Sequence, residues 1–210
     1  MDHATLWRHI HTERAALAAT LRTLTPQQWA HESLCTGWSV QDVAAHVISN
    51  PQIGWRQLPA VFADAARLGY NEAIFRDVRR RGQQPREQIV ADFERWATST
   101  RHVPTTTSVE TLVDALVHHQ DIVRPLGLHH DPDPTAASVA ADRCRLLAGL
   151  LGSRRVVRGV RMVATDTDWA RGSGPVVEAA MVELLMLCAG RPADPARLTG
   201  EASDALRALV

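Results

Sequence analysis

One stretch of the sequence, residues 113–127, places the strongest constraint on what this chain can fold into. Asp114 and His118 are four residues apart, a spacing that stacks two side chains on one face of an α-helix. Asp121 follows three residues later and can lie beside the imidazole of His118. Apolar side chains surround these polar groups: Leu112, Val113, Leu116, Val117, Ile122 and Val123. Such a helix is expected to be buried, and burying two carboxylates and an imidazole is costly unless something, such as a divalent cation, pairs them.

The composition is that of a globular protein without a charged partner surface. The chain has 210 residues, the length of one large domain or of one domain with a small appendage, and 45% of them are hydrophobic. It carries 23 basic and 23 acidic residues, so its formal net charge is zero. Neither nucleic acid nor an anionic membrane is therefore indicated as a partner. Every basic residue is Arg, and the lack of Lys excludes Schiff-base catalysis.

The cysteines and the apolar runs favour a cytoplasmic protein. Cys35, Cys144 and Cys188 are widely spaced and form no CxxC pair, which argues against a zinc site made of cysteines. Their odd number suggests a reducing compartment. The N-terminus has no basic region followed by an apolar run, so no signal peptide is expected. The longest apolar run, residues 179–189, is too short to span a membrane and contains Glu183.

The second informative stretch is C-T-G-W-S-V-Q-D-V-A-A-H, which ends at His46. Gly37 permits a tight turn, and Ser39 followed three residues later by Asp42 is a variant of the capping box. These residues predict a helix that starts next to Ser39 and carries His46 two turns later. Pro51 lacks an amide hydrogen, so this helix is predicted to kink or restart there.

Apolar residues at helical spacing predict further helices along most of the chain: residues 4–24, 27–31, 55–68, 72–81, 86–100 and 136–151. Ser108 is the expected N-cap of the central helix, which should end near Pro125. After residue 155 the pattern becomes rich in Val with interspersed Arg, which predicts a β-strand over residues 156–163. Helices are predicted again over residues 178–189 and 201–210. We therefore expect a mainly α protein, with a helical bundle over residues 1–152 and a small α/β appendage over residues 153–210.

Two motifs make the chain similar to a known family. They are Cys35-x-Gly37-Trp38-Ser39-Val40-x-Asp42-Val43-x-Ala45-His46 and His118-x-Gln120-Asp121-Ile122-x-Arg124-Pro125-Leu126-Gly127. In combination they resemble the signatures of the maleylpyruvate isomerase-like, mycothiol-dependent enzymes, which belong to the wider DinB/YfiT-like superfamily. The C-terminal segment is similar to the end of that family: Val163-Ala164-Thr165-Asp166, Trp169, Gly174-Pro175 and an apolar helix closing on Ala189-Gly190-Arg191. The resemblance thus extends over nearly the whole chain.

The resemblance implies a DinB-like, up-and-down four-helix bundle that binds one divalent metal, usually zinc. It implies His46, Asp114 and His118 as the metal ligands, where the best-known relative has Glu at the position of Asp114. Because Asp is one methylene shorter, we expect a tighter site or a different metal preference. The resemblance also implies mycothiol as the thiol cosubstrate. Three protein ligands would leave at least one coordination position open, as catalytic metal sites do.

Residues beside these motifs allow alternative interpretations. Asp121 is either an acceptor that holds the His118 ring or the salt-bridge partner of an Arg on another helix. Asp121 and Arg124 are candidates for orienting the site rather than for the chemistry itself. Cys35 is interpreted as a packed small side chain and not as a nucleophile, because no array of a His and an acid is visible around it in the sequence. Trp38 is interpreted as a core anchor at the entry of its helix.

Three other groups are interpreted as structural. His119 is one residue away from the predicted ligand face. His129, His130 and Asp131 look like a ligand cluster, but they lie in a loop that is rich in Pro. Residues 79–81 are three consecutive Arg and are expected to form solvated surface. The alternative is that they hold an anionic substrate or the carboxylate of a thiol.

Two main functional hypotheses follow. In the first, the metal holds a low-molecular-weight thiol as its thiolate at neutral pH, and the thiolate attacks a small electrophilic substrate. The enzyme is then an S-transferase or a cis/trans isomerase. In the second, the chain is a metal- or thiol-binding module without turnover, because a fold does not by itself determine an activity. A third hypothesis is a helical scaffold that binds no metal, and a measurement of metal content alone would test it.

Overall fold

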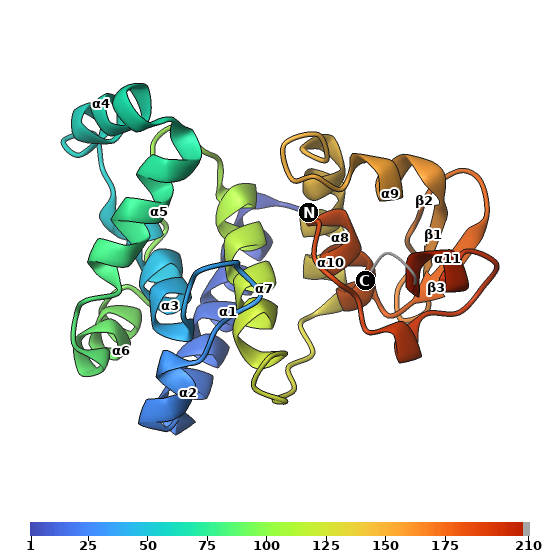
Figure 1. The fold of residues 1–210 in the computed structure, drawn as a ribbon, viewed down its shortest axis with the longest axis horizontal. Coiled ribbons are helices and arrows are strands. Elements are labelled where there is room, and N and C mark those ends of the chain that lie inside the picture. Colours follow the sequence, from blue (N-terminus) through green and yellow to red (C-terminus); the bar gives the residue numbers. More distant parts are fainter. Residues whose placement is uncertain (208–210) are drawn as a thin grey trace. The chain divides into compact units, whose positions relative to one another are not determined.

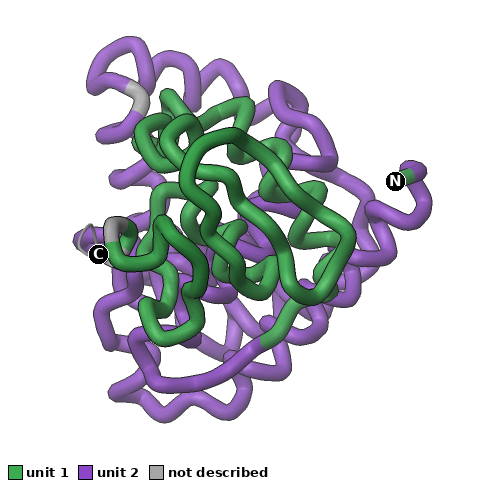
Figure 2. The backbone as a smooth tube through the Cα atoms, turned by 90° about the vertical axis from the view of Figure 1, so that its right-hand side faces the viewer, with its two compact units in different colours: residues 1, 131–210 green, residues 2–130 purple. Residues whose placement is uncertain are grey.

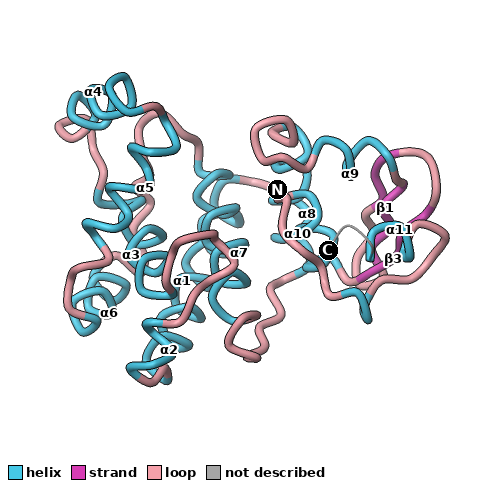
Figure 3. The backbone as a smooth tube through the Cα atoms, viewed as in Figure 1, coloured by secondary structure: helices cyan, strands magenta, loops and turns pink. Residues whose placement is uncertain are grey.

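The computed structural model of the chain describes residues 1–207 (Figure 1). Helices dominate these residues, and the strands lie in the C-terminal part (Figure 3). The predicted fold class, a mainly α protein with a small C-terminal α/β part, is confirmed. The chain divides into two compact units, residues 2–130 and residues 131–210, with Met1 assigned to the latter (Figure 2). We describe each unit by itself.

The first unit is helical. Its elements are α1 (His3–Thr23), α2 (Pro26–Ala30), α3 (Val40–Ser49), the 3₁₀ turn η1 (Asn50–Gln52), α4 (Leu58–Leu68), α5 (Tyr70–Arg81), α6 (Arg86–Arg95) and α7 (Ser108–Val123). Helix α1 packs against α6 and α7, and α3 packs against the same two helices, so these elements close a bundle. Apolar side chains from all of them meet in one buried cluster that includes Leu17, Val43, Ile48, Phe93 and Ile122. Removing this apolar surface from water is the main source of the bundle's stability.

The entry to α3 follows the predicted pattern. Gly37 has φ +77°, a left-handed conformation that L side chains rarely adopt, and it turns the chain into the helix. The Ser39 side chain accepts from the Asp42 amide, and the Asp42 carboxylate accepts from the Ser39 amide, which is the expected capping box. The α-helix ends at Ser49, and Pro51 falls in the 3₁₀ turn that follows. The predicted interruption near Pro51 is therefore present.

The N-cap of α7 differs by one residue from the prediction. Thr107, and not Ser108, has the extended backbone of a cap, with φ −111° and ψ 170°. Its hydroxyl accepts from the Val109 amide at 3.2 Å, and its own amide donates to the Glu110 carboxylate at 3.0 Å. Thr107, one position before Ser108, also has a hydroxyl that can cap the helix. Glu110 lies three residues after Thr107 and completes a capping box, which Ser108 would lack.

The second unit combines helices with a small sheet. Its elements are α8 (Pro134–Leu146), α9 (Arg154–Gly159), β1 (Arg161–Ala164), β2 (Ala170–Gly172), β3 (Val176–Ala179), α10 (Met181–Cys188), the 3₁₀ turn η2 (Pro195–Arg197) and α11 (Ser203–Arg207). The strand order is β2-β1-β3, with β1 antiparallel to β2 and parallel to β3. Helix α8 packs against α10. The predicted boundary at residue 152 would place α8 with the bundle, and this division stays a prediction.

Two predicted elements of the second unit are wrong in part. Residues 154–159 are helical, and strand β1 begins only at Arg161, so it covers no more than residues 161–163 of the predicted strand 156–163. The apolar positions 156, 157 and 160 also fit helical spacing, and the Val157 amide bonds to Ser153 in a helical turn. The predicted helix 178–189 begins only at Met181. Val176–Ala179 alternates between exposed and buried side chains and pairs with β1 instead.

Several helix ends also differ from the predicted ranges. Helix α6 ends at Arg95 rather than near residue 100, and α8 ends at Leu146 rather than near residue 151. Of the predicted helix 201–210, Ser203–Arg207 is helical, and residues 208–210 lie outside the described part of the chain. Over residues 1–207, the helices are too short or too polar to cross a membrane.

Candidate metal centre

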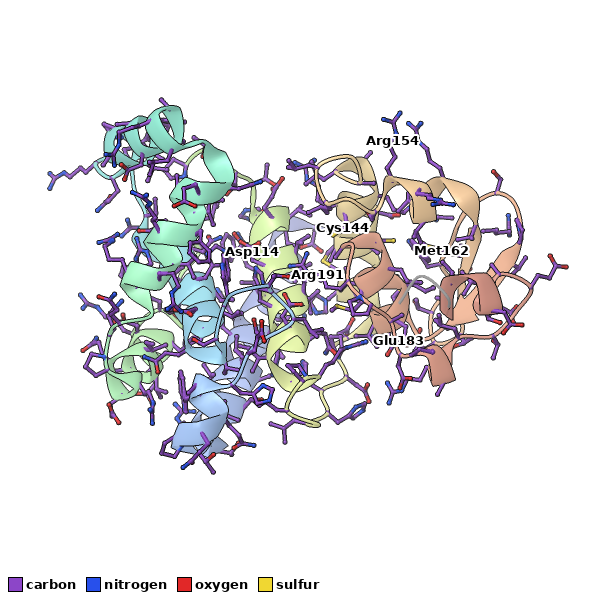
Figure 4. The ribbon with its side chains drawn as sticks, viewed as in Figure 1. Asp114, Cys144, Arg154, Met162, Glu183 and Arg191 are labelled. Atoms are coloured by element: carbon purple, nitrogen blue, oxygen red, sulfur yellow. The ribbon has the colours of Figure 1, made fainter. Side chains whose placement is uncertain are left out.

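The bundle brings together the three side chains that were predicted as metal ligands. His46 comes from α3, and Asp114 and His118 come from successive turns of α7, where Figure 4 labels Asp114. Each offers one ligand atom, and these atoms all lie within 4.8 Å of one another. The two imidazole rings are nearly perpendicular, at 87°, with centroids 5.1 Å apart. Residues 68 positions apart in the sequence therefore lie close enough together to be candidate ligands of one cation.

Asp121 holds the ring of His118. Its Oδ2 lies 2.8 Å from His118 Nδ1, and both side chains are buried. Burial opposes protonation of His118, but the hydrogen bonds with Asp121 and Cys35 and the negative charge of Asp121 outweigh it and raise the pKa of His118 to about 10. The contact supports the interpretation of Asp121 as the acceptor for His118. With Nδ1 engaged, Nε2 is the ring atom that remains for a metal.

Cys35 has neighbours that the sequence did not reveal. Its Sγ lies 3.1 Å from Asp121 Oδ2 and 3.7 Å from His118 Nδ1. An array of a His and an acid around Cys35, which was not visible in the sequence, therefore exists in space. The backbone reinforces the contact, because the Leu34 amide donates to the Asp121 carbonyl at 3.0 Å. Cys35 thus belongs to the surroundings of the candidate ligands and is more than a packed small side chain.

Trp38 lies against the same histidines. The centroid of its ring is 5.3 Å from that of His46 and 6.4 Å from that of His118. It is also packed against the apolar cluster of the bundle, as predicted for a core anchor. Trp38 therefore contributes both to the core and to the wall beside the candidate ligands. Trp38 directly follows the turn at Gly37, and this turn brings its ring next to the two histidines.

The other residues singled out from the sequence have more distant or structural roles. Arg124, the C-cap of α7, donates from Nε to Gln120 at 2.9 Å and lies about 9 Å along the helix axis from His118. Of the Arg run, Arg79 binds the buried Asp42 carboxylate at 2.7 Å. Arg81 binds Asp77 and is largely buried, so this run is not simply solvated surface.

A second cluster joins α1, α7 and the loop that follows α7. His119 Nδ1 and His130 Nε2 lie 2.7 and 2.8 Å from the same oxygen of Glu13, and the two rings stack with centroids 3.8 Å apart. Thr20 Oγ1 lies 3.0 Å from His119 Nε2. Because these groups already satisfy one another, we interpret the cluster as a structural clamp. This agrees with the structural role predicted for His119.

Buried charge in this clamp shifts two pKa values. Burial raises the pKa of Glu13, but the hydrogen bonds and charges of His119 and His130 outweigh it, so this pKa lies below its ordinary value of 4.5. Burial lowers the pKa of His119 from 6.5, against the opposing pull of Glu13. Burial therefore determines the direction of the shift for His119, whereas the contacts with the two imidazoles determine it for Glu13.

Comparison with known proteins identifies the N-terminal part of the chain. The family described as mycothiol maleylpyruvate isomerase N-terminal domain matches residues 10–110, a range that contains His46 but ends before Asp114. No curated protein matches the sequence significantly.

Two solved structures share the fold. The crystal structure of a mycothiol-dependent maleylpyruvate isomerase has a TM-score of 0.59 and 14% identity, with 97% of this chain and 94% of that chain covered. A histidine-to-alanine mutant of a protein with the same description has a TM-score of 0.60 and 12% identity over the same shares. At such identities the likeness concerns the fold alone. Residues 10–110 therefore match the mycothiol maleylpyruvate isomerase N-terminal domain family, within a chain that has the fold of the maleylpyruvate isomerase structures.

Proposed function

We propose that the protein is a metal-dependent enzyme that uses mycothiol, a low-molecular-weight thiol, to act on a small electrophilic substrate. The reaction is either S-transfer or cis/trans isomerisation. The observation that carries this proposal is the convergence of His46, Asp114 and His118 within 4.8 Å. The descriptions of the matching family and of the similar structures name both the thiol and an isomerisation.

The residues present fit a divalent cation such as zinc. Two imidazoles and one carboxylate are ligands that zinc prefers, and three protein ligands leave a position for a substrate atom. The contact between Asp121 and His118 is the usual support of a ligating imidazole, because it sets the tautomer and the ring orientation. When bound, the cation supplies the Lewis acidity that holds a thiol as its thiolate at neutral pH.

The protein groups around the centre orient the reactants. Asp121 fixes the ring of His118 and accepts from the Cys35 thiol, while Trp38 provides an apolar wall beside both histidines. The thiolate sulfur forms a C–S bond with an electrophilic carbon of the substrate. In S-transfer this bond remains, and the group that it displaces leaves with the electron pair of its former bond to that carbon. In cis/trans isomerisation the sulfur adds to a carbon of the double bond, and the π electron pair moves onto the conjugated carbonyl group. Rotation about the carbon–carbon bond, which is now single, precedes return of that electron pair, which restores the double bond, breaks the C–S bond and releases the thiolate.

The proposal is tested by removing and restoring the metal. Protein stripped with a chelator should show no turnover of maleylpyruvate, or of a generic electrophile, with mycothiol. Addition of zinc should restore the turnover. Full activity after stripping would argue against the metal, whereas stoichiometric zinc binding without consumption of any electrophile would favour a binding module. We also propose a cytoplasmic location, which the free thiols of Cys35, Cys144 and Cys188 support.

A further inference from the structure

Asn50 connects the two helices that carry the candidate ligands. It lies at the end of α3, four residues after His46, with the helical backbone angles φ −51° and ψ −53°. His46 and Asn50 therefore share one face of α3, as Asp114 and His118 share one face of α7. Asn50 Nδ2 lies 3.1 Å from Asp114 Oδ2, and Asn50 is 7% exposed. A buried amide thus meets the carboxylate of a candidate ligand.

Thr111 holds the other end of this amide. Its hydroxyl donates to Asn50 Oδ1 at 3.2 Å, and Thr111 is 2% exposed. The direction of the chain of hydrogen bonds is determined by chemistry, because an ionised carboxylate only accepts. The NH₂ group of Asn50 must therefore face Asp114, and its carbonyl oxygen faces the hydroxyl of Thr111.

We propose that Asn50 is a positioning residue of the metal centre, which holds the Asp114 carboxylate in place for a divalent cation while Thr111 holds the Asn50 amide. This inference rests on the proposed function, because it assigns a role around the same site. Partners of this kind fix the orientation of ligating side chains, and their loss typically weakens metal affinity by about 10- to 100-fold. His118 is supported by Asp121 in the same way, so each ligand on α7 has its own buried partner.

The chain offers a matched control for the loss of an amide. Gln52, two residues further on, donates from Nε2 to Asp92 Oδ2 at 3.1 Å, the same distance as the Asn50 contact. Its Oε1 accepts from Arg81 at 3.3 Å. Asp92 is not among the candidate ligands. Gln52→Ala therefore removes a comparable amide–carboxylate bond from the same turn without touching the centre.

The test is a double-mutant cycle on zinc affinity, measured on metal-stripped full-length protein by competition with a chromophoric chelator. Asn50→Ala should weaken zinc binding by about 10- to 100-fold, whereas Gln52→Ala should leave it unchanged. In an Asp114→Ala background, Asn50→Ala should change the affinity by less than about twofold, because its partner is already gone. A merely structural role would instead give losses that multiply in the double mutant.

A second pair of variants covers the case in which Asn50→Ala fails to fold. Thr111→Val removes the hydroxyl that anchors the amide and should weaken zinc binding, while Thr111→Ser retains the hydroxyl and should preserve it. Equal affinity of the wild type, Asn50→Ala and Thr111→Val would overturn the role of Asn50 alone. A wild-type protein that binds no zinc would overturn the metal centre and the role of Asn50 together.

Discussion

His118 is the residue on which most of the proposed chemistry depends. One side of its ring faces Asp121 and Cys35, and its ligand atom lies within 4.8 Å of those of His46 and Asp114. If the proposed cation binds there, replacing this buried imidazole by a side chain that cannot ligate a metal removes a ligand. Asp121, in contrast, would affect the metal only indirectly, through the ring of His118. Substitutions at these two positions should therefore have different consequences.

His118→Ala should remove a ligand, so that metal content and thiol-dependent turnover fall in parallel while the fold survives. Asp121→Asn keeps the shape but loses the charge that favours the ligating tautomer. It should retain metal at saturating zinc and turn over about 10- to 100-fold more slowly. Metal analysis and steady-state kinetics measure both effects, with the exposed His31→Ala as the control. If His118→Ala left metal content and turnover intact, the buried polar groups of α7 would be purely structural.

At the scale of elements, the N-terminus of α7 decides where the ligand pair sits. The helix starts at Ser108 because Thr107 and Glu110 satisfy each other's backbone amides at its first turn. Asp114 lies six positions after this start, so the first turns of α7 carry the carboxylate, and Thr111 between them anchors Asn50. Local capping and the geometry of the candidate metal centre are therefore connected through α7.

Thr107→Ala should destabilise the first turn of α7 by about 1 kcal/mol, because the Val109 amide loses its acceptor. The amides of the first turn should then exchange with solvent about fivefold faster. Ser108→Ala, at the position predicted from the sequence as the cap, should leave their exchange nearly unchanged. Hydrogen exchange followed by NMR distinguishes the two variants. Faster exchange in Ser108→Ala than in Thr107→Ala would show that the cap lies at Ser108.

At the scale of the whole molecule, the pH dependence of stability comes from groups whose pKa differs between the folded and the unfolded chain. Glu13 is the clearest of these, because its pKa lies below 4.5 in the folded chain. Below pH 4.5 the Glu13 carboxylate therefore binds a proton more readily in the unfolded chain than in the folded chain. The contribution of Glu13 to stability is therefore complete above pH 4.5 and is lost as the pH falls through the folded pKa.

Glu13→Gln should lower the stability of the metal-free protein at neutral pH by about 2 kcal/mol, the scale of a lost hydrogen bond to a charged group. The difference from wild type should shrink as the pH falls below 4.5, since Glu13 itself becomes protonated. Melting temperatures across the acid range provide the measurement. Glu94→Gln, which breaks an exposed pair with Arg22, is the control and should have little effect at any pH. A difference that stays constant down to the acid limit would contradict this role of Glu13.

Much of this protein was predictable from local sequence patterns. The spacing of Asp114 and His118 indicated two side chains on one helix face, and the Ser39–Asp42 capping box placed His46 on another helix. Both signals depend on contacts within a few residues, which the backbone alone determines. Residues 156–159 of α9 and the end of β3 were misassigned because short Val-rich runs fit both helical and extended spacing.

Only the tertiary structure decided which distant groups meet. Cys35 approaches Asp121 across 86 residues, and Asn50 approaches Asp114 across 64 residues. The four-residue spacing from His46 to Asn50 was present in the sequence, but an amide at that spacing is common and indicates no particular partner. Such contacts depend on how α3 and α7 pack, which follows from burial of apolar surface over the whole bundle and not from any local pattern.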